Sequence, residues 1–479
     1  MGEAGPTLAQ QLARFAAGTS YSSVPEEVRG SVRLRLLDVL GVSLAALPLD
    51  SSRAVTEHVA ENSGAPHATA LGLGARVPAA GAALVNGALA HSLDFDDTHL
   101  PSVVHPSATV IPAALAAAEQ QHAHGRDLIT AIAVGIEVCV RLGMAGYDPR
   151  SGNSMFFEHG QHATSICGAM GAATSAALLR GLDAEGVGNA LGVAASMASG
   201  IIEANRTGGT VKRLHCGWAA QAGVSAAALA ARGFTGPPTV LEGRFGLFQA
   251  FLRGDYHRDA LLNSLGERWS TLDIMFKPYP ANHFTHAGID AAFAMRARGV
   301  RAQDVAQLRL GVPGPTVRTI GQPITVKRAP QDGYQAQFSG PYTVVAGLLG
   351  GGGLGLGLDD FTDQLATDPL RRDLMAKVSV QADPLCDELY PWQFPAVLTV
   401  RTVDGRELTE VVRHNRGGPK RPMSPAELEA KFVDNAGRVL PRGVVERVGH
   451  SAMKADDLPD AAALFSPVAE MLDKTVGSR

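Results

Sequence analysis

The feature that most constrains the fold is a run of helical periodicity that occupies more than half of the chain. From Pro6 to about Leu272, Ala, Leu, Val and Met recur at spacings of three and four residues, as in SSVPEEVRGSVRLRLLDVLGVSLAAL. Ser23, followed by Glu26 and Glu27, predicts a capped start for one of these helices. Because Ala and Gly are abundant, the helices can approach closely, and several are expected to be buried on more than one side.

The pattern changes near Phe276. Two prolines in KPYPANHF end the helical periodicity, and one more helix is predicted from Thr285 to about Arg298. The alternating segments VAQLRLGVP, AKVSVQADP and AVLTVRTVDGRELTEVVR then predict strands. Within the last segment, Asp404 and Gly405 form the dipeptide typical of a hairpin turn.

After the hairpin the chain returns to helical periodicity, and Ser424 with Glu427 predicts a capping box at the start of a helix. At 479 residues the chain is long enough for two hydrophobic cores. We therefore predict a mainly α fold, with a large all-helical domain formed from both chain ends and a smaller inserted α+β lid domain. The predicted boundaries are 1–272 and 414–479 for the helical domain and 273–413 for the lid.

Charge and cysteine content restrict the class of function. The 42 Lys and Arg residues nearly balance 46 Asp and Glu residues, which argues against nucleic acid or an anionic membrane as the main partner. The apolar runs are interrupted by charge, so no membrane-spanning helix is expected, and the N-terminus lacks the apolar run of a signal peptide. Four scattered cysteines without a C-x-x-C pair indicate a reducing compartment and predict neither a zinc nor a disulfide framework. We therefore predict a cytoplasmic protein.

Four polar clusters interrupt the apolar sequence and carry the candidate chemistry. The first is HSLDFDDTHLPSVVHPS, from His91 to Ser107, where acids, a threonine and histidines lie between Ala-rich helices. An alternative is that Asp96 or Asp97 caps a helix and that His105 with the following proline ends one, and for each residue taken singly this alternative stays open. A solvated loop would carry Lys, Glu and Ser instead, so the whole set favours a functional site.

The second cluster is EHGQHATSICG, in which His159 and His162 are three residues apart. This spacing could place two metal ligands on one helical face, but no cysteine or acid follows at a familiar interval. No metal is therefore predicted, and the flanking glycines indicate a backbone turned closely toward a ligand.

The third cluster is NRTGGTVKRLHCGWAAQAG, with Lys212, Arg213 and His215 within four residues. Such groups at the start of an Ala-rich helix suit anion binding. The alternative is a solvated basic turn. Trp218 and the alanines after it are expected to be buried, which argues against this alternative.

The fourth cluster is FKPYPANHFTHAGIDAA, with Lys277, His283 and His286. It lies where the helical body passes into the mixed domain, a common position for a ligand cleft. Taken alone, Lys277 would be interpreted as a surface lysine.

Several other chemistries lack their motifs. No G-x-S-x-G is present, no G-x-G-x-x-G opens a helix after a predicted strand, and the run from Gly351 to Gly353 has no G-K-[ST] behind it. Lysine and arginine can hold carboxylates, while histidine exchanges a proton near neutral pH. The residues thus predict acid–base chemistry on an organic anion without a cofactor.

Taken together, the clusters resemble the MmgE/PrpD family, which includes 2-methylcitrate dehydratase, cis-aconitate decarboxylase and iminodisuccinate epimerase. The resemblance covers nearly the whole chain, and its carriers are HSLDFDDTHLPSVVHPS, GQHATSICGAMGAA, GGTVKRLHCGWAAQAG, GFTGPPTVLEGRFGLFQAF and FKPYPANHFTHAGIDAA. It implies a helical domain with a lid, usually in a homodimer, and a site in the cleft between the two domains. The site residues that it implies are Asp94, Thr98, His105, His162, Lys212, Lys277 and His283.

Two departures from the family pattern stand out. Asn282 lies where many relatives have cysteine or histidine, and the spacing after Lys277 differs by one residue between family branches, which affects the assignment of His283. The segment VPGPTVRTIG lacks a tyrosine that the decarboxylase branch offers there. The second departure argues against cis-aconitate decarboxylation.

The resemblance and the residues together predict a mechanism. Lys212 and Lys277, with Arg213, would hold the substrate carboxylates and stabilise the enolate that forms when the adjacent carbon loses a proton. His162 or His105 would act as the base and the other histidine as the acid.

The supporting groups would be Asp94 and Thr98, which orient a histidine or bind a substrate hydroxyl, and His215, which contacts the substrate. We therefore predict a cofactor-independent lyase of the 2-methylcitrate dehydratase kind, acting on a small di- or tricarboxylic acid. The alternatives are a dicarboxylate epimerase, a cis-aconitate decarboxylase and a non-catalytic carboxylate-binding scaffold.

Overall fold

The computed structural model describes residues 5–62, 64–204 and 208–468, and the chain divides into two compact units. The first unit comprises Met1–Ile274 and Phe432–Arg479, and the second comprises Met275–Lys431. Residues 414–431, which the sequence predicts to belong to the helical domain, fall within the second unit. The structure is mostly helical with small sheets, so the mainly α prediction is confirmed, while the role of the second unit as a lid stays a prediction.

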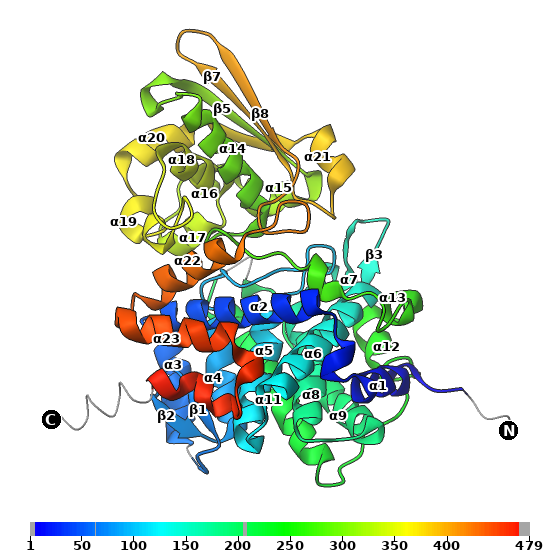
Figure 1. Ribbon diagram of the computed structural model, residues 1–479. Coiled ribbons are helices and arrows are strands. Elements are labelled where there is room, and N and C mark those ends of the chain that lie inside the picture. Colours follow the sequence, from blue (N-terminus) through cyan, green and yellow to red (C-terminus); the bar gives the residue numbers. More distant parts are fainter. Residues whose placement is uncertain (1–4, 63, 205–207, 469–479) are drawn as a thin grey trace. The chain divides into compact units, whose positions relative to one another are not determined.

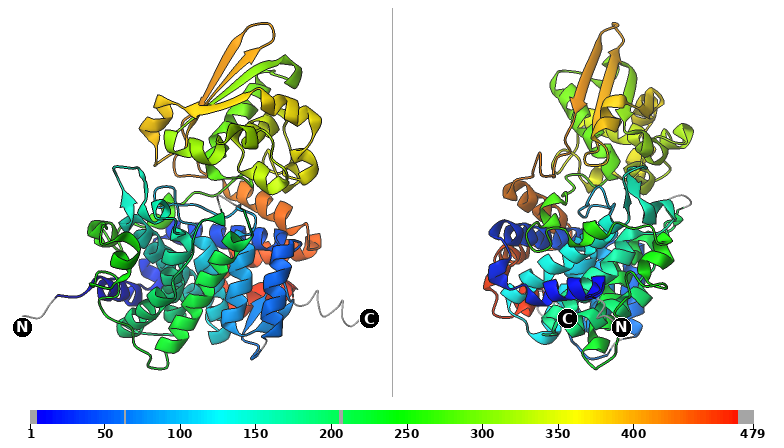
Figure 2. Two further views of the ribbon diagram at one scale, coloured as in Figure 1. Left: turned by 180° about the vertical axis from the view of Figure 1, so that it is seen from behind. Right: turned by 90° about the vertical axis from the view of Figure 1, so that its right-hand side faces the viewer.

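The first unit is built from helices and two short antiparallel strand pairs (Figures 1 and 2). Its helices are α1 (Leu8–Gly18), α2 (Glu26–Ala45), α3 (Asp50–Glu61), α4 (Ala79–His91), α5 (Ser107–Gln121), α6 (Gly125–Ala145), α7 (Met155–Glu158), α8 (Ala163–Leu179), α9 (Ala184–Met197), α11 (Val211–Ala230), α12 (Leu247–Leu252), α13 (Arg258–Leu262) and α23 (Arg442–Met453). Its strands are β1 (Ala68–Ala70), β2 (Ala75–Val77), β3 (Tyr147–Asp148) and β4 (Asn153–Ser154). The C-terminal helix α23 packs beside α2, so both ends of the chain contribute to this unit.

Small residues let the central helices touch backbone to backbone, as their abundance predicts. A Cβ added to Gly217 in α11 would lie 2.2 Å from the carbonyl oxygen of Leu84 in α4, and one added to Gly87 would lie 2.7 Å from the Cα of Gly217. Contacts this close exclude any side chain at either glycine. The end of α4 and the start of α11 are therefore held side by side.

Two details of the first unit differ from expectation. Helix α2 starts after Pro25, with no side-chain cap, while Ser23 belongs to a 3-10 turn and accepts a hydrogen bond from the backbone N–H of Ser20. The predicted Ser23 cap is wrong because Pro25 holds the N-cap position, and the Ser23 hydroxyl is already hydrogen-bonded to the backbone of Ser20 within its own turn. Among the described residues, α6 is the one helix long and apolar enough to span a membrane, contrary to expectation, and 89% of its apolar window is buried inside the protein, as in a core helix.

The second unit combines a four-stranded sheet with helices. Its strands are β5 (Val305–Val312), β6 (Val378–Ala382), β7 (Ala396–Thr402) and β8 (Glu407–Val412), in the order β6-β5-β7-β8. Its helices are α14 (His286–Ala297), α15 (Gly314–Ile320), α16 (Ile324–Lys327), α17 (Gly333–Gln337), α18 (Gly340–Leu349), α19 (Asp363–Ala366), α20 (Pro369–Ala376) and α21 (Pro384–Leu389). Strand β5 pairs parallel to β6 and antiparallel to β7, which pairs antiparallel to β8.

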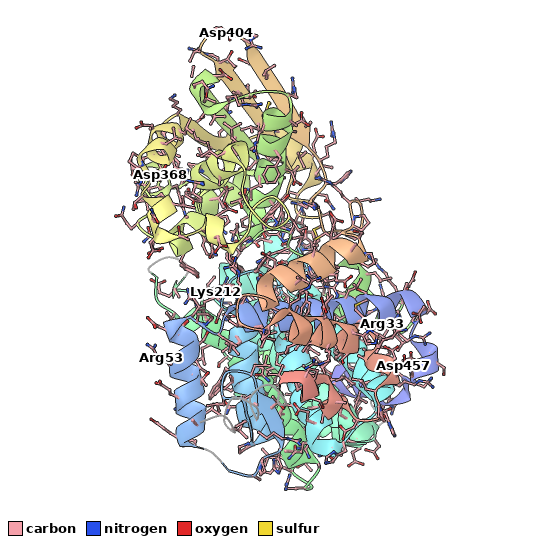
Figure 3. The ribbon with its side chains drawn as sticks, turned by 60° about the vertical axis from the view of Figure 1, so that its left-hand side comes forward. Arg33, Arg53, Lys212, Asp368, Asp404 and Asp457 are labelled. Atoms are coloured by element: carbon pink, nitrogen blue, oxygen red, sulfur yellow. The ribbon has the colours of Figure 1, made fainter. Side chains whose placement is uncertain are left out.

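The predicted elements of this unit are confirmed where their signals are local. All predicted strands form, and the hairpin turns at Gly405, whose φ is +88°, next to Asp404 at the tip in Figure 3. Helix α14 matches the predicted helix after KPYPANHF. Helix α22 (Pro425–Ala436), which spans the boundary between the units, starts with the predicted capping box: the backbone N–H of Ser424 donates to Glu427, and the backbone N–H of Glu427 donates to the serine hydroxyl.

Candidate active site

Four buried histidines from separate stretches of the chain lie together in the first unit. His91 is the last residue of α4, and His105 lies in the loop just before α5. His162 is the N-cap residue of α8, and His215 lies near the start of α11. The ring centroid of His91 lies 4.9 Å from that of His105 and 5.7 Å from that of His162. The centroid of His215 lies 4.9 Å from that of His162, so the rings form a continuous line, which we call the imidazole row.

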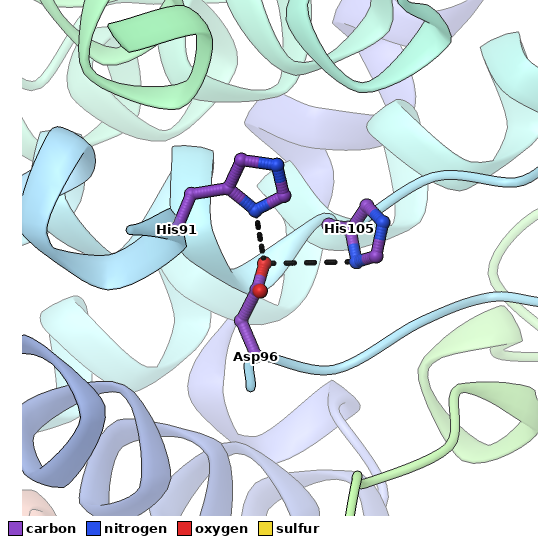
Figure 4. A group of neighbouring side chains, drawn as sticks. All are labelled: His91, Asp96 and His105. Atoms are coloured by element: carbon purple, nitrogen blue, oxygen red, sulfur yellow. Dashed lines mark hydrogen bonds and ion pairs between the residues drawn. The ribbon is translucent and has the colours of Figure 1, made fainter. Parts of the chain in front are cut away.

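Asp96 orients one end of the imidazole row (Figure 4). Its Oδ2 lies 2.9 Å from Nδ1 of His91 and 3.6 Å from Nδ1 of His105. Nδ1 of His105 also lies 2.7 Å from the carbonyl oxygen of Asp97 and 3.3 Å from Oγ1 of Thr98. Because a carbonyl oxygen only accepts, this Nδ1 carries the hydrogen, which leaves the lone pair of the neutral ring on Nε2.

The other end of the row is a pair of imidazoles joined nitrogen to nitrogen. Nδ1 of His162 lies 2.9 Å from Nδ1 of His215, so one of these atoms donates a hydrogen and the other accepts it. Burial, with positive charge from His91 and Lys212, holds the pKa of His162 well below its ordinary value. Burial, His91 and Lys212 also lower the pKa of His215 to about 4. Both rings are therefore neutral near pH 7 in the protein without a bound anion.

A buried ion pair lies beside this pair of rings. Nζ of Lys212, in the first turn of α11, lies 3.2 Å from Oδ1 of Asp94, and the two residues are 8% and 4% exposed (Lys212 is labelled in Figure 3). Asp94 has a φ of +50° and Val103, in the same loop, a φ of +54°. A β-branched residue rarely adopts this left-handed conformation, and such strain is typical of functional loops. The loop between α4 and α5 therefore holds its polar side chains in a fixed, strained arrangement.

The second unit carries its own buried cationic and imidazole side chains. Lys277 and His283 are 1% and 5% exposed, and the rings of His283 and His286 have centroids 4.5 Å apart. Nε2 of His286 lies 3.0 Å from the carbonyl oxygen of Ala281, to which it donates. The side chain of Asn282 accepts from the backbone N–H of Phe284 and so caps the turn that contains His283.

Comparison with known proteins identifies the family. The MmgE/PrpD N-terminal domain matches residues 10–259, and the MmgE/PrpD C-terminal domain matches residues 279–454. The chain belongs to the MmgE/PrpD family. This result confirms the resemblance found in the sequence.

Its relatives in this family include enzymes named for one reaction. Cis-aconitate decarboxylase of Mus musculus is 31% identical over 457 residues, covering 91% of this chain and 88% of the mouse protein. Cis-aconitate decarboxylase of Homo sapiens is 32% identical over 402 residues, which are 81% of this chain and 79% of the human protein. Cis-aconitate decarboxylase of Aspergillus terreus is 25% identical and covers 98% of this chain and 96% of the fungal protein.

The residues that the MmgE/PrpD resemblance implies fall into two groups. The structure brings together Asp94, Thr98, His105, His162 and Lys212 in the first unit, around the imidazole row. The remaining two, Lys277 and His283, belong to the second unit, and their meeting with the first group stays a prediction.

Three other residues from the polar clusters have contacts or an exposure that the sequence did not predict. Nη1 of Arg213 donates to the hydroxyl of Ser51 in α3 at 2.8 Å, so its contact with a substrate stays a prediction. Trp218 is 43% exposed, so the prediction that it is buried is wrong. It follows exposed Val211 by seven residues and therefore shares the outer face of α11. His159 is exposed, and its ring bonds to the carbonyl of Phe251 rather than facing His162.

One group in this MmgE/PrpD site has the composition of a metal site. Ligand atoms of His91, Asp96 and His105 all lie within 4.8 Å of one another. A metal bound through Nδ1 of His105 would have to displace the hydrogen that this atom donates to the carbonyl of Asp97. The observed contacts fit a hydrogen-bonded cluster around Asp96, and the prediction of no metal remains to be tested with a chelator.

Two residues of the site were not singled out in the sequence. His91 begins the first polar cluster, in which only its neighbours were predicted to have roles. Arg35, 1% exposed in α2, pairs with Asp97 and donates to the carbonyl oxygens of Thr271 and Ile274 at 2.9 Å. The available signal was spacing: Arg35 follows Val32 by three residues and precedes Val39 by four, which places it on the buried face of α2, and a buried arginine must have partners.

Proposed function

We propose that this member of the MmgE/PrpD family is a lyase that acts on a small polycarboxylic acid at the carbon beside a carboxylate. The observation that carries the proposal is the buried imidazole row next to the ion pair of Lys212 and Asp94. Histidine exchanges protons near neutral pH, and a buried ammonium group stabilises negative charge that develops close to it.

The helix ends around the row favour an anionic substrate. His162 occupies the N-cap position of α8, Lys212 lies in the first turn of α11, and His105 precedes the N-terminus of α5. The first backbone N–H groups of a helix and its dipole attract negative charge. Three such N-termini, with one lysine, therefore form surroundings suited to carboxylates.

The proposed roles follow the chemistry of each side chain. Lys212, with Lys277 and Arg213, holds carboxylates and stabilises the enolate-like charge. His162 and His105 exchange protons with the substrate carbon and with a leaving hydroxyl group where the reaction has one. Thr98 and Asp94 position these groups through the contacts already described.

Two reactions fit this arrangement. Decarboxylation of cis-aconitate is the first candidate, because relatives that match across most of the chain carry that name. Dehydration of a 2-methylcitrate-type acid is the second, because residues 312–321 lack the tyrosine expected of the decarboxylase branch. Both reactions place negative charge on a carbon next to a carboxylate, and an epimerase would do the same.

The test is product analysis by proton NMR in deuterated water with cis-aconitate, citrate and 2-methylcitrate. Decarboxylation is expected to yield a product with one carboxylate fewer and one deuterium on the former anionic carbon. Dehydration would produce an alkene without loss of carbon. A thermal shift with these acids and no turnover would contradict the proposal and favour a carboxylate-binding scaffold.

We also propose that the protein is a cytoplasmic homodimer. Val211, Trp218 and Leu229 are 47%, 43% and 40% exposed and recur on one face of α11. Exposed apolar residues grouped on one face are typical of a contact surface. Light scattering of the wild type and of Trp218→Glu tests this, and a wild-type monomer at micromolar concentration would contradict it.

A further inference from the structure

We infer that His162 and His215 form a proton relay, in which His215 is a positioning residue that exchanges a proton with His162 and makes no contact with the substrate. The inference rests on the proposed function, because it needs His162 to exchange a proton with a substrate. It differs from the expectation that His215 binds the substrate directly. The contact that carries it is the 2.9 Å approach of the two Nδ1 atoms.

The contact couples the tautomers of the two rings. A neutral imidazole has one N–H donor and one lone pair, so an Nδ1-to-Nδ1 hydrogen bond needs one ring of each tautomer. When the hydrogen is on Nδ1 of His162, the lone pair of that ring is on Nε2. The ring of His215 then accepts through Nδ1 and carries its own hydrogen on Nε2. In this arrangement His162 has Nε2 ready as a base.

Proton removal then balances in one step. The substrate C–H bond breaks, its electron pair is delocalised onto the neighbouring carboxylate, and the proton joins Nε2 of His162. The Nδ1 hydrogen of His162 passes to Nδ1 of His215. His162 ends neutral with its hydrogen on Nε2, and His215 ends as an imidazolium. In reverse, the same pair supplies a proton to a carbon that has lost carbon dioxide.

Hydrogen bonds to the backbone of both residues position the two rings next to each other. The N–H of His162 donates to the carbonyl of Gly200 at 3.0 Å, and Oγ of Ser165 donates to the carbonyl of His215 at 3.2 Å. Gly200 has a φ of +136°, and a Cβ there would lie 3.0 Å from the Cβ of Ser165. A glycine is therefore required at this position, and the short distance between the rings is built into the fold.

The charges around the relay link it to substrate binding. His162 is faced by His91 from α4, by Lys212 and His215 from α11 and by His105 from the loop before α5. His215 is faced by His91 and Lys212. A carboxylate bound to Lys212 offsets the positive charge that otherwise opposes protonation of either ring. The relay therefore accepts a proton most readily when an anionic substrate is present.

The kinetic test compares His215→Asn with His159→Asn as the matched control, using cis-aconitate as the probe, or 2-methylcitrate if that acid is the one turned over. Asparagine places an amide near the former Nδ1 and keeps a hydrogen bond to His162, but it cannot take up a proton. We expect His215→Asn to lower kcat about a hundredfold with KM within about twofold, and to alter the pH profile of kcat. His159→Asn should match the wild type.

Two kinetic outcomes would overturn the relay. An unchanged kcat in His215→Asn would show that no proton passes to residue 215. A raised KM with unchanged kcat would show that His215 is a substrate contact, as first expected. Neither outcome affects the proposed function, which depends on wild-type turnover.

Nitrogen-15 NMR of histidine-labelled wild-type protein tests the shared hydrogen without any substrate. We expect a scalar coupling between two Nδ1 nuclei that disappears in His215→Asn and persists in His159→Asn. Two rings that both carry hydrogen on Nε2, without this coupling, would overturn the relay even in an active enzyme. If no acid is turned over, the proposed function fails, and the coupling alone decides whether the two rings share a hydrogen.

Discussion

Each unit of the molecule contains a pair of buried histidines, and the two pairs differ in what their ring nitrogens contact. His162 and His215 in the first unit have ring centroids 4.9 Å apart and meet nitrogen to nitrogen. His283 and His286 in the second unit have centroids 4.5 Å apart, and Nε2 of His286 donates to a backbone carbonyl. A carbonyl can only accept, so it fixes one tautomer, whereas a second imidazole can exchange a hydrogen. Burial alone therefore does not mark a histidine as an acid or base.

The charged groups around the two histidine pairs differ as well. Lys212, which is paired with Asp94, lies close to the first pair, and its charge lowers the pKa of both rings. Near the second pair, Tyr279 packs edge-on against His286 and donates to Asp290 at 2.6 Å, and Asp290 also pairs with Arg421. This second network pairs its own charges within the unit, as expected of a structural core.

The largest expected effect is on turnover in the first pair. His162→Gln keeps a polar side chain but cannot exchange a proton, so kcat is expected to fall about a hundredfold to ten-thousandfold with a small change in KM. Steady-state kinetics with the acid turned over by the wild type provide the measurement. His159→Asn serves as the control, and retained turnover in His162→Gln would remove His162 from the mechanism.

The next effect concerns the cation beside the first pair. Lys212→Met removes the ammonium group that offsets substrate charge, and kcat/KM is expected to fall about tenfold to a hundredfold, since a hydrogen bond to a charged group contributes about 1.5–3 kcal/mol. The change also leaves the carboxylate of Asp94 buried without this partner, so the midpoint of urea unfolding should fall.

The double variant Lys212→Met with Asp94→Asn separates the two effects of the lysine. It should recover stability without recovering activity. Recovery of activity in the double variant would show that Lys212 serves only to neutralise Asp94.

The second pair should respond in the opposite way. His286→Phe removes the donor to the carbonyl of Ala281, and leaving a buried acceptor without its partner costs about 1–3 kcal/mol of unfolding free energy. Because His286 is not part of the proposed mechanism, kcat of the folded enzyme should stay within about twofold of the wild type. Urea denaturation and kinetics on the same preparation measure both quantities. A large loss of kcat at unchanged stability would make the second pair functional and end the contrast.

The sequence predicted those features whose physical cause is local. The strand alternation, the hairpin turn at Gly405 and the capping box at Ser424 depend on neighbouring residues, and the structure contains all of them. The cap at Ser23 failed because Pro25, also local, competes for the same helix start. Burial of Trp218 failed because its apolar neighbours do not reveal which face of the helix points outward.

The candidate site was predictable as a set of residue types but not as a set of contacts. The contact between His162 and His215 depends on the packing of α8 and α11, which are far apart in sequence. The position of His91 next to these rings depends on the backbone contact between Gly87 and Gly217. Neither contact has a periodic or spacing signal, so His91 received no role, whereas the polar clusters and then the family resemblance pointed to His162 and Lys212.

The smallest expected effect is on the pH dependence of stability, and it concerns the first pair, His162 and His215. The pKa of His215 is lowered to about 4 and that of His162 is lowered as well, while an unfolded histidine titrates near 6.5. Between these values the unfolded chain binds protons that the folded protein does not, so the unfolding free energy should fall as pH decreases from about 6.5 toward 4. His215→Asn removes one such group, and its stability should fall less steeply over that interval than that of His159→Asn, measured by urea unfolding at several pH values.

Adding a saturating carboxylate should also flatten the wild-type curve, because an anion on Lys212 raises the pKa of both rings. Equal slopes for the two variants would mean that His215 titrates normally in the folded protein, and the two histidine pairs would then differ in hydrogen-bond geometry alone.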